Sequence, residues 1–270
     1  MTNIIALLMN HNKTLTGSIS LLSCLLTLNL TSNGQIAQAA QPENAPPALK
    51  NLLTQIDTAS SRGDIKGVMQ FYSPKFTHGD GLNRQTMEQA LKSFWQRYPQ
   101  LRYSTRLKSW KSEGKTIIAE TVTTITGLPS SNRNNLALNA TITSRQRIAG
   151  TKILHQEILS ERTQLTSGNK PPQVEIKLPQ QVKVGQKYSF DAIVQEPLGN
   201  DFLLGSAMEE TIQPSKYLNP TPVNLELLSA GGLFKTGTAP STPGQQWISA
   251  VILRNDGMTM ITQRLKVVKK

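Results

Sequence analysis

The sequence predicts an α+β domain, a cone of three helices packed on a curved antiparallel sheet, followed by an all-β sandwich. Three observations lead to this prediction. Residues 47–98 place apolar side chains at helical spacing, residues 101–165 change to strand-like alternation, and residues 171–270 hold short strands separated by turn-rich segments. A chain of 270 residues accommodates about two domains of roughly 100–150 residues each.

The first 40 residues have the layout of a cleavable export signal. Lys13 is their only charge, the apolar stretch from Leu15 to Leu30 follows it, and an Ala-x-Ala motif ends at Ala39. The apolar stretch is shorter than the ~20 residues that a permanent membrane helix needs. We therefore expect residues 1–40 to be removed and the mature protein, without a membrane span, to reach the periplasm, the thylakoid lumen or the extracellular space.

Cys24 is the single cysteine of the chain and lies inside this predicted signal. Its context, Leu21-Leu22-Ser23-Cys24, loosely matches a lipoprotein signal, but four leucines follow within six residues and favour cleavage further on. The mature chain then has no cysteine. That excludes disulfides, thiol catalysis and cysteine metal sites.

Three helices are predicted at the start of the first domain, residues 47–166. The first, near residues 47–62, carries leucine and isoleucine at i, i+3, i+4 and i+7. The second covers residues 65–72 with Asp64 as its N-cap, and the third covers residues 84–98.

Four strands follow, at residues 101–108, 116–126, 136–148 and 153–165, each with alternating or β-branched side chains. Because they are long neighbours in sequence, we expect an antiparallel meander that curves over the helices.

The second domain, residues 171–270, is predicted to be a sandwich of two antiparallel sheets, because turn signals such as Asn255-Asp256-Gly257 separate its short strands. A Pro-bearing linker from Thr166 to Pro172 is expected between the domains. Charge also separates them. Residues 47–166 hold 17 basic and 8 acidic residues, whereas residues 171–270 hold 10 and 8.

Three strings of the first domain carry a family resemblance: FYSPKF, the helix end SFWQRYPQL and the strand RYSTRLKSW. In this order they resemble the nuclear transport factor two-like, or ketosteroid-isomerase-like, superfamily. The strings VKVGQKYSFDAIVQEPLG and ILRNDGMTMITQRLKVV resemble an immunoglobulin-like bacterial exported domain. The pairing looks like exported cyanobacterial proteins named for their transport-factor-like domain.

The resemblance implies a conical pocket between sheet and helices, which some relatives use for acid-base catalysis and others for binding or for dimerisation through the sheet. No motif of this chain matches the catalytic patterns of those relatives residue by residue. We expect four aromatic residues to line the pocket or the core around it: Tyr72, Trp95, Tyr98 and Tyr103.

Two pairs of titratable residues are the catalytic candidates. His78 and Asp80 could share a proton, although the glycines around Asp80 favour a tight turn, and two ligands are too few for a metal. His155 and Glu157 project from one face of their strand, which points either into the cone or to solvent. We expect no cofactor and no metal.

Five basic residues are predicted to form a face that attracts an anionic partner, either an acidic protein, an anionic lipid or an acidic polysaccharide. An exported protein is not expected to meet nucleic acid. The alternative for this face is a solvated surface without a partner. These residues are Arg102, Arg106, Lys108, Arg145 and Arg147.

The expected function is that of an exported, non-catalytic binding or assembly module that contacts a small ligand or an anionic partner through the first domain. The alternative is a small-molecule isomerase or dehydratase that uses acid-base catalysis in the cone.

Overall fold

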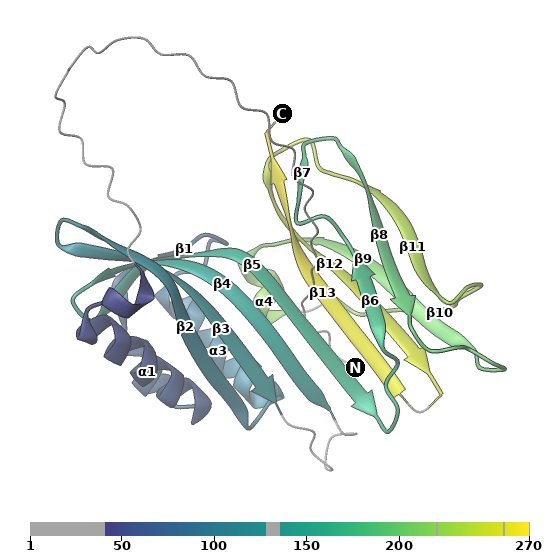
Figure 1. Cartoon of the computed structure of the whole chain (residues 1–270), viewed down its shortest axis with the longest axis horizontal. Helices are drawn as coiled ribbons and strands as arrows, with labels where there is room; N and C mark the ends of the chain where they lie inside the picture. Colours follow the sequence, from purple (N-terminus) through teal and green to yellow (C-terminus); the bar gives the residue numbers. More distant parts are fainter. Residues whose placement is uncertain (1–40, 128–135, 220, 256, 270) are drawn as a thin grey trace, which may run out of the picture.

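The computed structural model describes residues 41–127, 136–219, 221–255 and 257–269 (Figure 1). The predicted export signal lies outside the described residues. Within them the protein is mostly sheet, with four α-helices, and it confirms the α+β class. The main sheet has ten strands. Eight follow the order β10-β9-β12-β13-β5-β4-β3-β2, while β1 pairs with β5 and β7 pairs with β13.

The N-terminal half, residues 41–168, contains the helices α1, α2 and α3 and the first five strands. Figure 1 shows α1 and α3 on one side of the β2–β5 part of the sheet. The elements are the 3-10 helix η1 (Pro42–Asn44), α1 (Pro47–Ser61), α2 (Ile65–Met69), β1 (Tyr72–His78), α3 (Arg84–Arg97), β2 (Leu101–Glu113), β3 (Thr116–Gly127), β4 (Ala137–Ala149) and β5 (Lys152–Gly168).

The start of α2 agrees with its predicted cap, but its end does not. The Asp64 carboxylate accepts a hydrogen bond from the Gly67 N–H at 2.9 Å. The helix ends at Met69, and β1 begins at Tyr72, where the sequence predicted helix. Pro74 favours extended backbone before it, and the strand pairs in parallel with β5, a partner 80 residues away.

The C-terminal half, residues 169–269, adds strands to the same sheet and builds a second sheet of three strands, in the order β11-β8-β6. Its elements are β6 (Val174–Lys177), β7 (Gln181–Lys183), β8 (Lys187–Val194), β9 (Leu203–Thr211), α4 (Pro214–Leu218), β10 (Glu226–Leu227), β11 (Gly232–Thr238), β12 (Gly244–Arg254) and β13 (Gly257–Val268).

The two halves are joined by backbone pairing between β5 and β13. Leu165 lies opposite Met260, and the ladder continues to Gly168 opposite Gly257. The predicted linker from Thr166 to Pro172 therefore begins inside a strand. Its side chains are polar, so the sequence shows no apolar anchor there, yet the backbone of Thr166 is held by Thr259. One continuous sheet replaces the expected break at this point.

The main sheet has two faces that are covered differently. Its inner face carries Thr163 and Leu165 of β5, and α3 packs against it in a cluster with residues of both halves. Its outer face carries Gln164, which lies opposite Ile261. On β12 and β13 the outer face packs against Tyr188 and Phe190 of the second sheet.

Strand β2 forms one edge of the main sheet, and side chains of α1 bind its backbone. The Ser61 Oγ accepts the Tyr103 N–H at 2.9 Å, and the Asp57 carboxylate accepts the Thr105 N–H at 2.6 Å. These N–H groups have no strand on that side, so α1 supplies the missing acceptors.

Candidate binding site

A cavity of about 260 Å³ lies between the helices and the inner face of the sheet. Apolar side chains of α1 and α3 form one wall, and polar side chains of β4 and β5 form the other. The C-terminal half contributes Lys216, Tyr217 and Trp247. Other residues that line the cavity include Leu53, Ile56, Asp57, Tyr72, Ala90, Leu91, Phe94, Arg97, Tyr103, Ser144, Gln146, Gln156, Glu161 and Thr163.

A bulge in β5 decides which of its residues face the cavity. Ser144 of β4 lies opposite Ile158, but its neighbour Thr143 lies opposite Ser160, so one residue of β5 is extra at this point. The bulge changes the alternation of side chains. Gln156 before it and Glu161 after it consequently face the same cavity despite their odd spacing.

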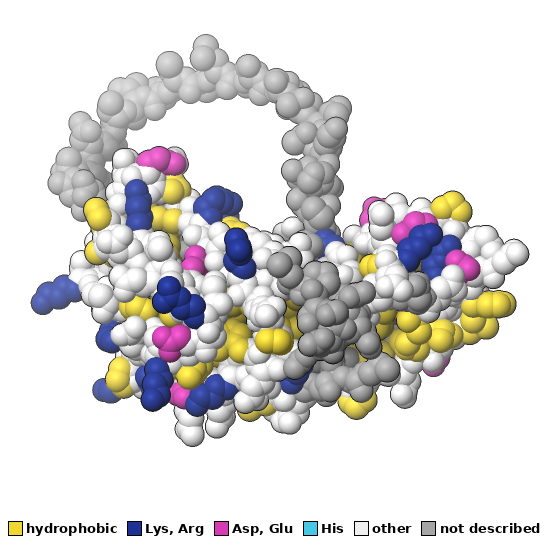
Figure 2. Space-filling model, turned by 90° about the horizontal axis from the view of Figure 1, so that it is seen from below, with side chains coloured by type: hydrophobic (Ala, Val, Ile, Leu, Met, Phe, Trp, Pro, Cys, Tyr) yellow, Lys and Arg dark blue, Asp and Glu magenta, His cyan; other side chains and the backbone are white. Residues whose placement is uncertain are grey.

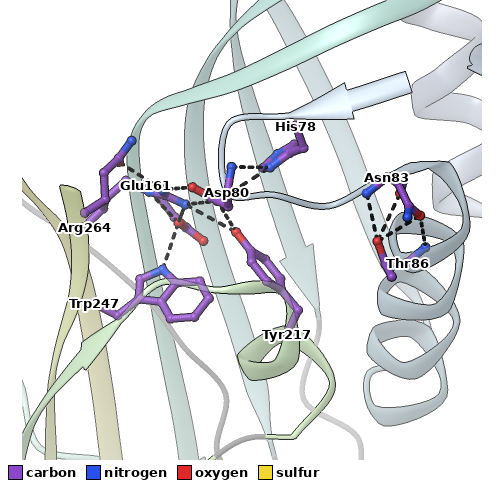
Figure 3. Close-up of polar contacts among 9 residues, drawn as sticks. His78, Asp80, Asn83, Thr86, Glu161, Tyr217, Trp247 and Arg264 are labelled. Carbon is purple, nitrogen blue, oxygen red and sulfur yellow. Dashed lines mark hydrogen bonds and ion pairs between the residues drawn. The ribbon is translucent and has the colours of Figure 1, made fainter. Parts of the chain in front are cut away.

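Arg264 of β13 binds two carboxylates at the junction of the halves (Figure 3). Its Nη1 and Nη2 atoms donate to the two oxygens of Asp80, each at 2.9 Å, and its Nε donates to Glu161 Oε2 at 2.9 Å. Nη1 also donates to Gln245 Oε1 at 2.9 Å. The Arg264 side chain is 1% exposed and that of Asp80 is 3% exposed. This buried ion network joins β13 to β5 and to the loop between β1 and α3.

The charges in this network stabilise one another. Burial opposes ionisation of Asp80, but the hydrogen bonds and charge of Arg264 outweigh it and hold the pKa of that carboxyl below its usual range. Burial also acts against the charged form of Arg264, yet the carboxylates of Glu161 and Asp80 raise its pKa. Both groups are therefore charged at neutral pH.

Tyr217 and Trp247 connect the network to the cavity. The Tyr217 hydroxyl donates to Asp80 Oδ2, and the Trp247 indole N–H donates to Glu161 Oε2 at 3.0 Å. Their rings are in edge contact, with centroids 4.9 Å apart. Burial raises the pKa of Tyr217 well above its ordinary value, so its hydroxyl keeps its proton and remains a donor.

The first predicted catalytic pair, His78 and Asp80, lies in a turn, and Asp80 is itself part of this network. The His78 carbonyl accepts the Gly81 N–H at 2.9 Å, and its Nδ1 accepts the Asp80 N–H at 3.1 Å. Burial lowers the pKa of His78 to about 4. Neither residue is among those that line the cavity.

The second predicted pair, His155 and Glu157, lies on the outer face of β5, opposite in direction to Gln156. The His155 Nδ1 shares a hydrogen bond of 2.8 Å with the Thr77 hydroxyl, and Glu157 accepts one from Arg145 at 3.1 Å. Both side chains therefore point away from the cavity, toward solvent.

The four aromatic residues expected at the pocket divide into two groups. Tyr72 and Tyr103 line the cavity. Trp95 is not among the lining residues, but it donates its indole N–H to the hydroxyl of Tyr103 at 2.9 Å. Tyr98 is buried in the cluster that joins the two halves.

The five predicted basic residues share the outer face of the sheet. Arg145 lies opposite Glu120, and Arg106 lies opposite Val122, two residues further along β3. Carboxylates accompany three of the five: Glu120 and Glu157 bind Arg145, Glu113 binds Arg147, and Glu120 lies 3.9 Å from Lys108.

Arg102 and Arg106 have no ion pair within the described part of the chain. In Figure 2, Lys and Arg side chains are spread over the N-terminal half, whereas hydrophobic side chains gather toward the other end. The large exposed hydrophobic residues are Phe202, Leu204, Leu227 and Phe234, all of the C-terminal half.

Sequence reasoning missed Glu161, Trp247 and Arg264. The signal for Arg264 is that it is the only charge from Gly257 to Leu265, a stretch of strand β13 that is otherwise apolar or uncharged. A lone charge in such a strand indicates a buried ion pair.

The described residues contain no group of three or more His, Cys, Asp or Glu arranged to hold a metal ion. None of the helices described is long and apolar enough to span a membrane.

Comparison with family models gives one match, described as a domain of unknown function (DUF8623), over residues 169–268. The search of curated proteins gave no match.

Among solved structures, the chain is similar to a protein of Bdellovibrio bacteriovorus (17% identity, 41% of this chain and 38% of that chain, TM-score 0.29). It is also similar to a cystatin-fold protein of Novosphingobium aromaticivorans (13%, 42% and 98%, 0.32). A third is an LEH-like epoxide hydrolase of Mycobacterium tuberculosis (9%, 41% and 80%, 0.30).

The chain thus spans well under half the length of the Bdellovibrio protein. The family-model match coincides with the C-terminal half, which begins directly after β5.

Proposed function

We propose that this protein is a binding module that holds a small, mainly apolar molecule in the cavity between its helices and the inner face of the sheet. The observation that carries the proposal is a cavity with one apolar wall, from Leu53, Leu91 and Phe94, and one polar wall, from Gln156 and Glu161. Ligand sites commonly combine such apolar surface with a few polar groups that orient the ligand.

The size of the cavity suits a small organic molecule. An engineered apolar cavity of about 150 Å³ holds benzene. The present cavity, at about 260 Å³, has room for a ring with a short polar substituent.

Binding is favoured over catalysis by the position of the titratable groups. The histidines described in the structure, His78 and His155, are outside the cavity lining. Glu161, a carboxylate on the wall, is held in place by hydrogen bonds from Trp247 and Arg264. The alternative, an isomerase or dehydratase, is supported by the same Glu161, which would act as its general base.

The wider proposal is that the module is exported, that its N-terminal half is nuclear transport factor two-like and that its C-terminal half is immunoglobulin-like. The support is the export-signal pattern of residues 1–40 and the two-layer packing of the C-terminal half. The outer face of the N-terminal half is the proposed contact for an anionic partner or for a second copy, since Arg102 and Arg106 are exposed there.

The test uses indole and cyclohexanemethanol as neutral probes, with binding measured by isothermal titration calorimetry. Ala90 lines the cavity, so Ala90→Phe should fill it and weaken binding at least about tenfold, the equivalent of 1.4 kcal/mol. The matched control is Ala48→Phe on the exposed side of α1, which should bind like the unchanged protein. Equal binding to both variants, or no binding of either probe, would overturn the proposal.

A further inference from the structure

We propose that the molecule held in the cavity is a protonated amine with an apolar body, and that its ammonium group binds the free side of the Glu161 carboxylate. This inference rests on the proposed binding function and names the class of ligand. It depends on three independent features of the cavity wall: its charge, the geometry of Glu161, and two glutamine oxygens.

The charged residues that line the cavity, counted together with the charged residues bound to them, carry a net charge of minus one. Asp57, Glu161, Arg97 and Lys216 line the cavity directly, while three further charged residues bind these or their partners. Four carboxylates thus stand against three cations. Excess charge away from water is unfavourable unless a counter-charge is supplied. The carboxylates counted are those of Asp57, Asp80, Glu161 and Glu210, and the cations are Arg97, Lys216 and Arg264.

The cations of this set are already engaged. Lys216 Nζ donates to Glu210 Oε1 at 3.1 Å and to the Thr221 hydroxyl at 2.6 Å. Arg264 donates to Asp80, Glu161 and Gln245. Arg97 donates to Ser93 Oγ at 3.3 Å. An anionic ligand would compete with these contacts for the cations, whereas a cationic ligand would leave them in place.

Glu161 is engaged through one oxygen. Its Oε2 accepts hydrogen bonds from the Trp247 indole and from Nε and Nη2 of Arg264. The hydrogen bonds found among the described residues leave Oε1 without a donor. The side chain is 12% exposed and lines the cavity. Because a carboxylate has about four acceptor positions, Oε1 can accept from a ligand N–H.

Gln146 and Gln156 add two acceptors further along the same wall. They lie opposite each other on β4 and β5. The Oε1 atom of each is buried without a hydrogen-bond partner in the described residues, and Gln146 is 8% exposed. Buried acceptors of this kind are normally paired. The wall is therefore suited to a ligand that donates hydrogen bonds.

Together these features favour a primary or secondary amine over an alcohol and an alcohol over a carboxylate. The ammonium would bind Glu161, the apolar body would contact Leu53, Leu91 and Phe94, and a second N–H or O–H of a longer ligand would reach the glutamines. Ammonium–carboxylate hydrogen bonds are roughly twice as strong as neutral ones.

The test compares cyclohexanemethylamine, cyclohexanemethanol and cyclohexanecarboxylate by isothermal titration calorimetry at pH 7. The three probes share one ring and differ in charge. The amine should bind at least about tenfold more tightly than the alcohol, which corresponds to 1.4 kcal/mol, and the carboxylate should bind weakest.

Two variants test which residues cause the preference for the amine over the alcohol. Glu161→Gln should reduce amine binding to the level of the alcohol, while Glu157→Gln, on the outer face of the same strand, should leave it unchanged. Gln146→Leu removes one unpaired acceptor and should weaken binding of a longer diamine, 1,3-bis(aminomethyl)cyclohexane, several-fold. It should leave binding of cyclohexanemethylamine unchanged, and it serves as the second variant if Glu161→Gln does not fold.

The outcomes separate the two proposals. Equal affinity for amine and alcohol, or full amine affinity in Glu161→Gln together with full diamine affinity in Gln146→Leu, would overturn the amine inference and leave the binding function intact. Absence of binding by all three probes, together with indole, would overturn both.

Discussion

The two halves of this protein share one sheet, but the N-terminal half covers its inner face with helices, whereas the C-terminal half covers its outer face with a second sheet. In the N-terminal half the inner face is covered by α1 and α3, a cavity remains beneath them, and the outer face is open. In the C-terminal half the outer face of β12 and β13 is covered by a second sheet, and Ile248, Ile261 and Leu265 are almost completely buried there.

The difference follows from the shapes of the covering layers. Two sheets pack face to face at about 10 Å, and their side chains interdigitate along the whole contact. A helix touches a curved sheet along a narrow stripe, so α1 and α3 leave space between their stripes. The covering element, rather than the strand pattern, decides whether the sheet holds a cavity or a closed core.

The largest expected effect comes from removing the cation between the halves. Arg264→Met would leave Asp80 and Glu161 as buried carboxylates without their counter-ion, and should lower the free energy of unfolding by about 3–5 kcal/mol. Urea denaturation followed by circular dichroism measures this.

The control for Arg264 is Arg145→Met on the outer face, where the side chain is 46% exposed. Exposed ion pairs contribute about 0–1 kcal/mol, so this variant should stay close to the unchanged protein. Similar losses of unfolding free energy in Arg264→Met and Arg145→Met would show that burial of the ion pairs at the junction does not increase their contribution to stability.

The second effect is a loss of stability in mild acid through His78. Burial lowers its pKa from 6.5 to about 4. Between pH 6.5 and pH 4, His78 therefore binds a proton in the unfolded chain but not in the folded chain. The stabilisation is complete above pH 6.5 and is lost as the pH falls toward 4. The shift corresponds to about 3 kcal/mol, measured as the urea midpoint at pH 7.5 and pH 4.5.

His78→Asn should remove most of this pH dependence, because asparagine does not titrate. Its amide oxygen can accept the Asp80 N–H in place of Nδ1, which preserves the turn. His155→Asn, on the outer face, should retain the dependence. The explanation fails if the two variants respond to acid alike.

The smallest expected effect on stability is at the open outer face. Arg106→Glu should change the free energy of unfolding by less than about 0.5 kcal/mol, since Arg106 has no ion pair in the described part of the chain. The same variant should elute from heparin, used as an acidic polysaccharide, at lower salt. Lys187→Glu in the second sheet is the control, and equal elution of both variants would remove the case for a basic partner face.

Local sequence patterns predicted much of the fold, because they depend on neighbours in the chain. The spacing of Leu49, Leu52 and Leu53 identified α1, and the alternation after Leu101 identified β2. Strand β1 was missed because its partner in β5 lies about 80 residues away and nothing local to Tyr72 indicates the pairing.

The candidate site was harder to predict because it depends on a bulge and on long-range pairing. The extra residue near Ile158 places Gln156 and Glu161 on one face, which simple alternation forbids. Arg264 reaches Asp80 across 184 positions of sequence. The expected linker at Thr166 likewise concealed the strand pairing that brings the C-terminal half to the cavity.

The contacts between α1 and β2 also bear on how the protein avoids association with other chains. An uncovered edge strand of 13 residues offers backbone groups to which a foreign strand could add, the usual route to aggregation. Ser61 and Asp57 occupy the N–H groups of Tyr103 and Thr105. Beyond them, Lys108 and Lys111 place charge along the strand. The helix α1, which forms part of the cavity wall, therefore also blocks the edge of the sheet against strand addition.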